Sequence, residues 1–317
     1  MDTKHLTTFL ALAKTLSYQK AAEQLQYAPS TLFKHIQVLE HELGTALFSR
    51  AGRQLRLTPE GEVFVEHVER MMRDYRRAID SVSGMRTQEE TITIGGCELN
   101  TGNSLLELFA QFSREHPQVR MSMLTSSNAS VPELVRSEMI DVGFCYSIGR
   151  HRHPGICTLN LYEEPVRLMA SRDNPIARKQ ALRYEDLQGL SFVHPHDSCC
   201  FVLELMPRLN GRGVSFKKNA YLGGVHLVVD YAREENALTL IPYSATQRFM
   251  KAYDMVPLDL AEEPLMAWEQ AVYRSDEALS PAAKLLLEHS VRYAKRRIDE
   301  HPQKILGLSD GERTLVS

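Results

Sequence analysis

The first sixty residues carry apolar side chains at intervals of three and four, the spacing that puts them on one face of a helix. This pattern predicts a helix over residues 3–16, a short one from Ser17 to about Gln26, and a third that begins at Pro29 and runs past Glu40. Ser17 suits an N-cap, and proline suits a first turn, where its missing N–H leaves nothing unpaired. The positions expected to be buried in the third helix are Leu32, Ile36, Leu39 and Leu43.

Only a brief turn separates the second and third helices, which is helix-turn-helix organisation. In such domains the second helix of the pair enters the DNA major groove. Further along, Gly52 and the alternation over residues 54–57 predict a hairpin with Arg50 and Arg53 near its tip, within reach of phosphates or a minor groove. Residues 1–58 are therefore expected to form a winged helix-turn-helix that binds double-stranded DNA.

Phe33 is a large apolar residue among the polar positions of the third helix. One interpretation is that it rests against thymine methyl groups, an apolar contact that the major groove offers. The other is that it folds back onto Tyr27 or the wing and shields the core. The sequence leaves both open.

Three segments of this region resemble the N-terminal domain of the LysR-type transcriptional regulators. They are Ser-x-x-x-Ala-Ala-x-x-Leu from Ser17, Ile-x-x-Leu-Glu-x-x-Leu-Gly-x-x-Leu-Phe-x-Arg from Ile36, and Leu-Thr-Pro-x-Gly from Leu57. The resemblance implies base-facing positions at Pro29, Ser30, Phe33 and Lys34, and backbone contacts from Thr31, Arg50 and Arg53; Ser17 and His35 complete the expected DNA-binding set. Family members usually carry serine where Phe33 stands and arginine where Lys34 stands, so the departures lie on the reading helix.

A long helix is predicted from Pro59 to about Arg86, and residues 59–88 are expected to link the head to the rest of the chain. Its apolar stripe needs a partner surface, and pairing with a second copy would supply one. The LysR-type regulators, which this region resembles, use the corresponding segment for dimerisation. The resemblance implies a homodimer or a homotetramer. The expected seam residues are Val68, Met72, Tyr75 and Ile79.

Strands alternate with helices over residues 91–300, which predicts an α/β fold with a mostly parallel sheet. The expected strands cover residues 91–96, 119–124, 141–146, 166–171 and 265–275. The layout resembles the family's effector domain, which is similar to periplasmic binding proteins and has two lobes with a ligand cleft between them. We assign residues 91–163 and 269–300 to lobe one, residues 164–268 to lobe two, and residues 301–317 to a loose tail.

Ligands of open α/β sheets lie past the carboxyl ends of the strands, and this rule selects the expected effector site. The selected loops are polar, and two of them carry an aromatic residue, which indicates a small aromatic or carboxylic acid; the absence of a basic residue in these loops weakens the carboxylate option. The expected effector-binding residues are Cys97, Asn100, Thr101, Ser126, Ser127, Cys145, Tyr146, His196, Cys199, Phe201, Gly224 and Val225.

Charge and cysteine content refine this picture. Residues 1–58 hold seven Lys/Arg and four Asp/Glu, and the remainder holds 30 and 36, so a basic head precedes an acidic body. No long apolar run occurs, which indicates a cytoplasmic protein without a membrane partner. The five cysteines at irregular positions do not suggest a disulfide framework; those at the cleft could line the pocket, sense thiol oxidation or hold a soft metal.

No G-x-G-x-x-G, G-x-x-x-x-G-K-S/T or G-x-S-x-G segment occurs, and His196, Asp197 and Ser198 are consecutive, which points their side chains apart. We therefore expect no enzyme, no catalytic residue, no metal site and no cofactor other than a small-molecule effector; RNA polymerase is a further possible partner. Two alternatives stay open: a thiol-based redox sensor that regulates genes, and a small-molecule binding protein whose DNA-binding head serves only assembly.

Overall fold

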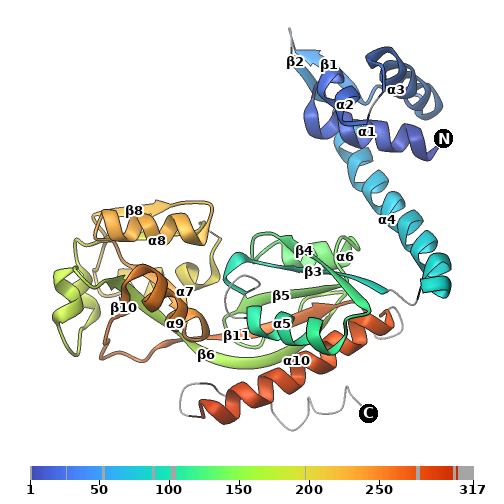
Figure 1. Cartoon of the computed structure of the whole chain (residues 1–317). Coiled ribbons are helices and arrows are strands. Elements are labelled where there is room, and N and C mark those ends of the chain that lie inside the picture. The colour runs from blue at the N-terminus through green and yellow to red at the C-terminus, as the bar shows by residue number, and fades with distance from the viewer. Residues whose placement is uncertain are drawn as a thin grey trace. The chain divides into compact units, whose positions relative to one another are not determined.

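The computed structural model describes residues 2–25, 27–51, 54–87, 90–100, 105–196, 198–275, 279–302 and 305 (Figure 1). The chain forms two compact units, Met1–Gln88 and Glu89–Ser317. Among the described residues, no helix combines the length and apolar character that a membrane crossing requires.

The N-terminal unit confirms the three predicted helices and the hairpin, but Leu43, which was expected to be buried, is 40% exposed. Its elements are α1 (Thr3–Thr15), α2 (Tyr18–Leu25), α3 (Pro29–Leu43), β1 (Phe48–Ala51), β2 (Gln54–Leu57) and α4 (Pro59–Thr87). The backbone N–H of Lys20 donates to Ser17 Oγ at 3.4 Å, so Ser17 lies at the N-cap position of α2. Helix α3 ends at Gly44, whose φ of 70° is the left-handed conformation that glycine adopts without steric cost.

The core of this unit gathers around Phe9, which packs against Phe48 of the wing and Phe64 of α4 with ring centroids 5.6 and 5.0 Å apart. Glu40 Oε1 accepts the backbone N–H groups of Leu47 and Phe48 at 2.8 and 3.2 Å, which fixes the start of the wing on α3. The wing, the reading helix and the start of α4 therefore form one packed body.

The C-terminal unit holds the remaining elements, which follow in chain order. They are β3 (Glu90–Gly96), α5 (Leu106–Glu115), β4 (Val119–Thr125), α6 (Val131–Arg136), β5 (Val142–Ser147), β6 (Cys157–Ser171), η2 (Pro175–Arg178), η3 (Tyr184–Leu187), β7 (Ser191–His194), α7 (Cys200–Asn210), β8 (Lys218–Tyr221), α8 (Val225–Glu234), β9 (Thr239–Pro242), α9 (Tyr243–Tyr253), β10 (Met255–Pro257), β11 (Leu265–Tyr273) and α10 (Pro281–Glu300).

The main sheet is mixed, so the prediction of a mostly parallel sheet was wrong. Its order is β10-β6-β11-β5-β3-β4, with β9 paired to β6. Only β3 with β4 and β3 with β5 are parallel, whereas β6, β10, β11 and β9 join through antiparallel pairs. A second, two-stranded sheet pairs β7 and β8 in parallel. Alternation of strands and helices does not reveal strand direction when a strand re-enters a sheet from another part of the chain.

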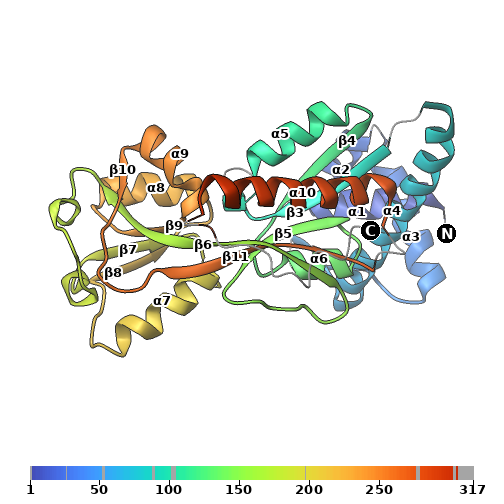
Figure 2. The same ribbon diagram turned by 90° about the horizontal axis from the view of Figure 1, so that it is seen from below.

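Strand β6 begins at Cys157, nine residues before the strand predicted at 166–171. Polar residues and Pro165 interrupt its apolar pattern, and proline within a run counts against a strand. The segment is nevertheless almost entirely buried, because it pairs with β11 on its way from one lobe to the other (Figure 2). The hydrophobic pattern does not predict β7, β8 or α7 either.

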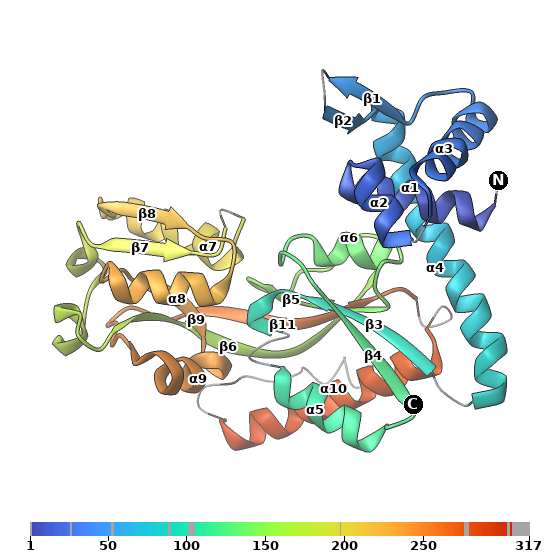
Figure 3. The same ribbon diagram turned by 45° about the horizontal axis from the view of Figure 1, so that its top comes forward.

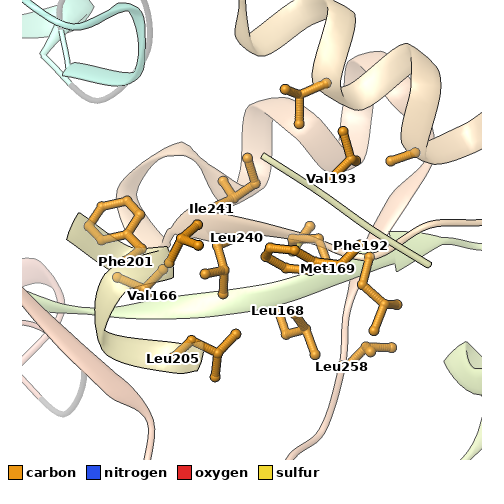
Figure 4. Packing of buried hydrophobic residues seen from close by; sticks show 14 of the residues in the cluster. Val166, Leu168, Met169, Phe192, Val193, Phe201, Leu205, Leu240, Ile241 and Leu258 are labelled. Atoms are coloured by element: carbon orange, nitrogen blue, oxygen red, sulfur yellow. The ribbon is translucent and has the colours of Figure 1, made fainter. Parts of the chain in front are cut away.

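Two buried clusters lie along the paired β6 and β11. One gathers β3, β5, α5 and α10 residues such as Ile94 and Phe112, and the other gathers residues of the second lobe such as Phe192 and Phe249. In the second cluster, Val166, Leu168 and Met169 of β6 pack among side chains of β9 and α7 (Figure 4). Each lobe thus has its own core, and β6 and β11 belong to both.

Gly61 offers a test of how tightly α4 packs against the wing. A Cβ at this position would lie 2.2 Å from the carbonyl oxygen of Leu47, which belongs to backbone and cannot rotate away. We expect Gly61→Ala to lower the free energy of unfolding of the N-terminal unit by about 1–3 kcal/mol, measured by denaturant unfolding. Glu66→Ala, an exposed change on the same helix, is the control; equal stability of both variants would contradict the packing argument.

Candidate functional site

A pocket of about 310 Å³ lies in the C-terminal unit, where the carboxyl ends of the parallel strands of both lobes meet. Figure 3 shows β3, β4 and β5 in one lobe and β7, β8 and α8 in the other. The lining residues come from the loops that follow these strands: Cys97, Glu98, Leu99, Thr125, Ser126, Ser127, Asn128, Tyr146, Pro195, His196, Cys199, Cys200, Phe201, Gly223, Gly224 and Val225.

Tyr146 and Asn128 organise the wall that lobe one contributes. The Asn128 side chain donates from Nδ2 to the Tyr146 carbonyl at 2.8 Å and accepts the Tyr146 N–H at 2.7 Å, which fastens the loop after β4 to β5. The Tyr146 ring then faces Phe201 of α7, with centroids 5.2 Å apart. One aromatic residue from each lobe therefore forms the apolar side of the pocket.

Glu98 connects the two lobes across the pocket. Its Oε2 accepts the backbone N–H of Val225, the first residue of α8, at 2.8 Å. Its Oε1 lies 3.3 Å from His226 Nε2. The N-cap residue Gly224 has no side chain to offer, so a carboxylate from the opposite lobe satisfies an amide at this helix start.

Two buried carboxyl groups lie beneath the pocket on the strands that join the lobes. Asn100 Nδ2 donates to Glu269 Oε1 at 2.7 Å, and the N–H and hydroxyl of Ser244 donate to Glu164 at 2.6 and 2.8 Å. Burial raises the pKa of Glu164 to about 7, against the hydrogen bonds from Ser244 and Tyr146 that lower it. Burial, with the charge of Glu164 added, raises the pKa of Glu269 well above its ordinary value. Tyr146 thus touches both the pocket and these carboxyl groups.

The thiols at the pocket are held in their protonated form. Burial raises the pKa of Cys97 to about 12 and also raises the pKa of the two other lining thiols, Cys199 and Cys200. Burial likewise raises the pKa of Cys145, which lies outside the pocket. All five cysteines are free. Because the thiolate is the form that reacts with oxidants, these side chains have the character of pocket lining rather than of redox sensors. In the part of the chain that the structure describes, no group of His, Cys, Asp or Glu could hold a metal ion.

Most of the predicted effector residues line this pocket, and two of the described ones do not. Asn100 is buried below it, where it bonds to Glu269. Cys145 is buried in lobe one beside Val131 and Val272, because alternate residues of β5 point to opposite faces. Thr101 lies outside the described residues. Glu98, Asn128 and Cys200 also line the pocket. They lie in the loops that the strand-end rule selects but are not in the expected effector-binding set, although Glu98 is the charged residue nearest the end of the first strand.

The predicted DNA-reading face of α3 is accessible. Pro29, Ser30 and Lys34 are exposed, Thr31 is half-buried, and Phe33 is 48% exposed. The Phe33 ring lies 5.9 Å from the Tyr18 ring of α2, so the neighbour it leans on is neither of the two expected from the sequence.

His35, by contrast, points toward the body of its own unit. Its Nδ1 lies 2.9 Å from Thr8 Oγ1 on α1, and its ring packs beside His5 and Tyr27. Burial lowers the pKa of His35, which favours the neutral imidazole. Ser17 carries the N-cap bond described above. Arg53 and the side chain of Arg50 lie outside the described residues.

The predicted dimer seam on α4 divides into two parts. Val68 and Met72 are buried in the core of the same N-terminal unit. Tyr75 and Ile79 are 47% and 46% exposed, and Met71 is exposed beside them. The seam prediction therefore rests on the second half of the helix.

Two family models match the chain. The LysR substrate binding domain matches residues 86–295, and the bacterial regulatory helix-turn-helix protein of the lysR family matches residues 3–62. The chain belongs to the LysR family. It is a DNA-binding transcriptional regulator that joins a helix-turn-helix domain to a C-terminal effector-binding domain.

Relatives and solved structures agree with this assignment. The HTH-type transcriptional regulator CitR of Bacillus subtilis (strain 168) is 25% identical over 264 residues, 81% of this chain and 87% of CitR. GltR of the same organism is 23% identical over 289 residues, 91% of this chain and 96% of GltR. The crystal structure of CbnR, a LysR family transcriptional regulator, matches with a TM-score of 0.75 at 20% identity, covering 93% of this chain and 99% of CbnR. Full-length CbnR in complex with its target DNA matches with a TM-score of 0.74 at 20% identity, covering 93% and 100%.

Glu164 makes the stability of the C-terminal unit depend on pH. Its folded pKa of about 7 exceeds its ordinary value of 4.5, so the folded state holds the proton more firmly than the unfolded state. The resulting stabilisation is complete below about pH 4.5 and is lost as pH rises through about 7, by up to about 3 kcal/mol. Because glutamine cannot ionise, we expect Glu164→Gln to remove this decline, measured by denaturant unfolding across that pH window.

Glu163→Gln on the same strand is the matched control, since Glu163 is the neighbouring residue and is only half-buried. It should keep the slope of the unaltered protein. A Glu164→Gln slope that also matches the unaltered protein would show that the Glu164 proton does not couple to folding.

Proposed function

We propose that this regulator binds operator DNA through α3 and the wing of paired copies, and that a small molecule held between the two lobes controls it. The observation that carries the proposal is the pocket, whose lining comes from loops of both lobes and converges at strand ends. A ligand there touches both lobes at once, so its binding favours one relative position of the lobes over others.

Tyr146 gives such a ligand a route to the strands that join the lobes. Tyr146 lines the pocket, and its side chain hydrogen-bonds to Glu164 and Glu269, which lie on β6 and β11. A ligand that shifts Tyr146 would therefore change the hydrogen bonds of two buried carboxyl groups. We infer that this change alters the spacing of the two DNA-binding heads in the oligomer, and with it the grip on DNA or the bend imposed on it.

The protein is inferred to work in the cytoplasm, where its operator lies, and to act by binding without catalysis. Of the two effector chemistries expected from the sequence, the aromatic one is supported by the facing rings of Tyr146 and Phe201. A carboxylic acid has less support, because no Lys or Arg is among the described residues that line the pocket. A thiol-sensing mechanism is disfavoured by the raised pKa values of the pocket cysteines.

Sequence reading by α3 is inferred to depend on Pro29, Ser30, Phe33 and Lys34. Half of the Phe33 side chain stays accessible beside Tyr18, which leaves an apolar surface for a thymine methyl group. Lys34 offers a single cationic point rather than the fork by which arginine reads guanine. Phosphate contacts are expected to supply most of the affinity and a steep dependence on salt.

Phe33→Ser tests whether this side chain reads bases. We expect the variant to keep its folded stability and to change its preferred operator, with a loss of about 1–3 kcal/mol on the original site. Binding would be measured on a library of operator variants at fixed salt. Gln37→Ser, an exposed change one turn along α3, is the control. A large fall in the melting temperature with an unchanged base preference would instead assign Phe33 a structural task.

The proposed function as a whole is tested by footprinting the DNA upstream of the regulator's own gene in excess nonspecific competitor. Protected patches separated by whole helical turns are the expected result, because a twofold oligomer places its two reading helices on one face of the duplex. If competitor abolishes protection there and across a genome-wide selection of fragments, the head serves only assembly, and the regulator proposal fails.

A further inference from the structure

Glu98 adds a negative charge to a pocket whose other described lining residues are mostly uncharged. Glu98 is the carboxylate among the described lining residues, and neither Lys nor Arg occurs among them. The thiols of Cys97, Cys199 and Cys200 add no charge, because burial keeps them protonated. Among the described lining residues, the acidic charge therefore comes from Glu98.

The start of α8 would ordinarily attract an anion, and Gly224 and Val225 at this helix start line the pocket. Here Glu98 Oε2 already accepts the Val225 N–H at 2.8 Å, and Oε1 lies 3.3 Å from His226 Nε2. His226 Nδ1 in turn bonds to the Tyr253 hydroxyl, so a neutral imidazole can accept at Nδ1 and donate at Nε2. A ligand carboxylate would have to displace Glu98 from this helix start and remain beside it as a like charge.

A ligand cation meets none of these obstacles. The Glu98 side chain is 32% exposed and lines the pocket, so an ammonium group can approach its carboxylate from the pocket. Tyr146 and Phe201 also line this pocket, with ring centroids 5.2 Å apart, and supply an apolar surface for the rest of the ligand. Ser126 also lines the pocket, and its hydroxyl group is of a kind that can accept an N–H bond from the ligand.

We propose that the effector of this regulator is a small amine, whose ammonium group pairs with Glu98 and whose apolar or aromatic part lies against Tyr146 and Phe201. The inference rests on the proposed effector site and specifies its ligand. Glu98 belongs to lobe one, and helix α8, whose Val225 N–H it accepts, belongs to lobe two. The ammonium group therefore binds beside a contact between the two lobes.

The test compares matched probes that differ only in charge: phenethylamine, phenethyl alcohol and hydrocinnamate, with butylamine and butyrate as an aliphatic pair. Binding to the full-length protein is measured by calorimetry and thermal shift at equal ionic strength. We expect phenethylamine to bind at least about tenfold more tightly than hydrocinnamate. A preference for hydrocinnamate, or the failure of every amine to bind at its highest soluble concentration, overturns the proposal.

Glu98→Gln keeps the size of the side chain and removes its charge, so it should abolish the preference for the amine over the alcohol and the acid. Glu263→Gln, an exposed change outside the pocket, should leave the preference intact. Glu98→Asp retains the charge and should retain the preference with weaker binding, which separates loss of charge from loss of fold. A preference that survives Glu98→Gln overturns the assignment of Glu98.

Footprinting by the same preparations separates this inference from the regulator proposal. If operator protection persists while the amines fail, the ligand class is wrong and the regulator proposal stands. If operator protection also fails, the proposed function itself is overturned.

Discussion

The pairing of β6 with β11 is the connection on which the effector domain depends. These two strands run through both hydrophobic cores, so each lobe folds around a part of the same ladder. Their register shifts between Glu269 and Gln270, at the level where one core gives way to the other. Polar side chains concentrate at this crossing, since the strands must pass between the two cores there. The lobes are thereby joined by a buried polar segment whose arrangement a ligand can influence.

Burial of Glu164 and Glu269 in that segment has an electrostatic consequence. Removing two carboxyl groups from water favours their protonated forms. The charge of Glu164 raises the pKa of Glu269 further. Ser244, Asn100 and Tyr146 supply the hydrogen bonds that make the burial tolerable. Of these three residues, Tyr146 is the one that also lines the pocket. Its side chain therefore lies between the ligand site and the paired strands β6 and β11 that join the lobes. Glu98 of lobe one lines the same pocket and accepts the Val225 N–H at the start of α8 in lobe two.

In the DNA-binding unit, helix α3 has one face packed in the core and one face exposed. On α3, Ile36 and Leu39 are buried and His35 bonds to α1, which fixes the angle at which Phe33 and Lys34 are presented. Helix α4 repeats the arrangement on a larger scale. Its first half covers the core with Val68 and Met72, while its second half leaves Tyr75 and Ile79 accessible.

The sequence by itself determined the features that depend on neighbours within one turn or one motif. Helical spacing and caps such as Ser17 and Pro29 fixed the elements of the N-terminal unit, and the ordered LysR segments identified the family, because local geometry follows directly from residues three or four apart. The strand-end rule placed most pocket residues as well.

Tertiary structure alone decided what depends on residues distant in the chain. Pairings between distant segments decide three features that no local pattern encodes. They are the strand directions in the mixed sheet, the first half of β6, which the sequence did not predict, and the burial of Asn100 and Cys145. Glu98 is the clearest case. Its loop gives no sign of a special task, and its importance follows from the approach of α8, whose first amide lies 127 positions away along the chain. Contacts of that range are set by how two cores share one pair of strands, which spacing along the sequence cannot express.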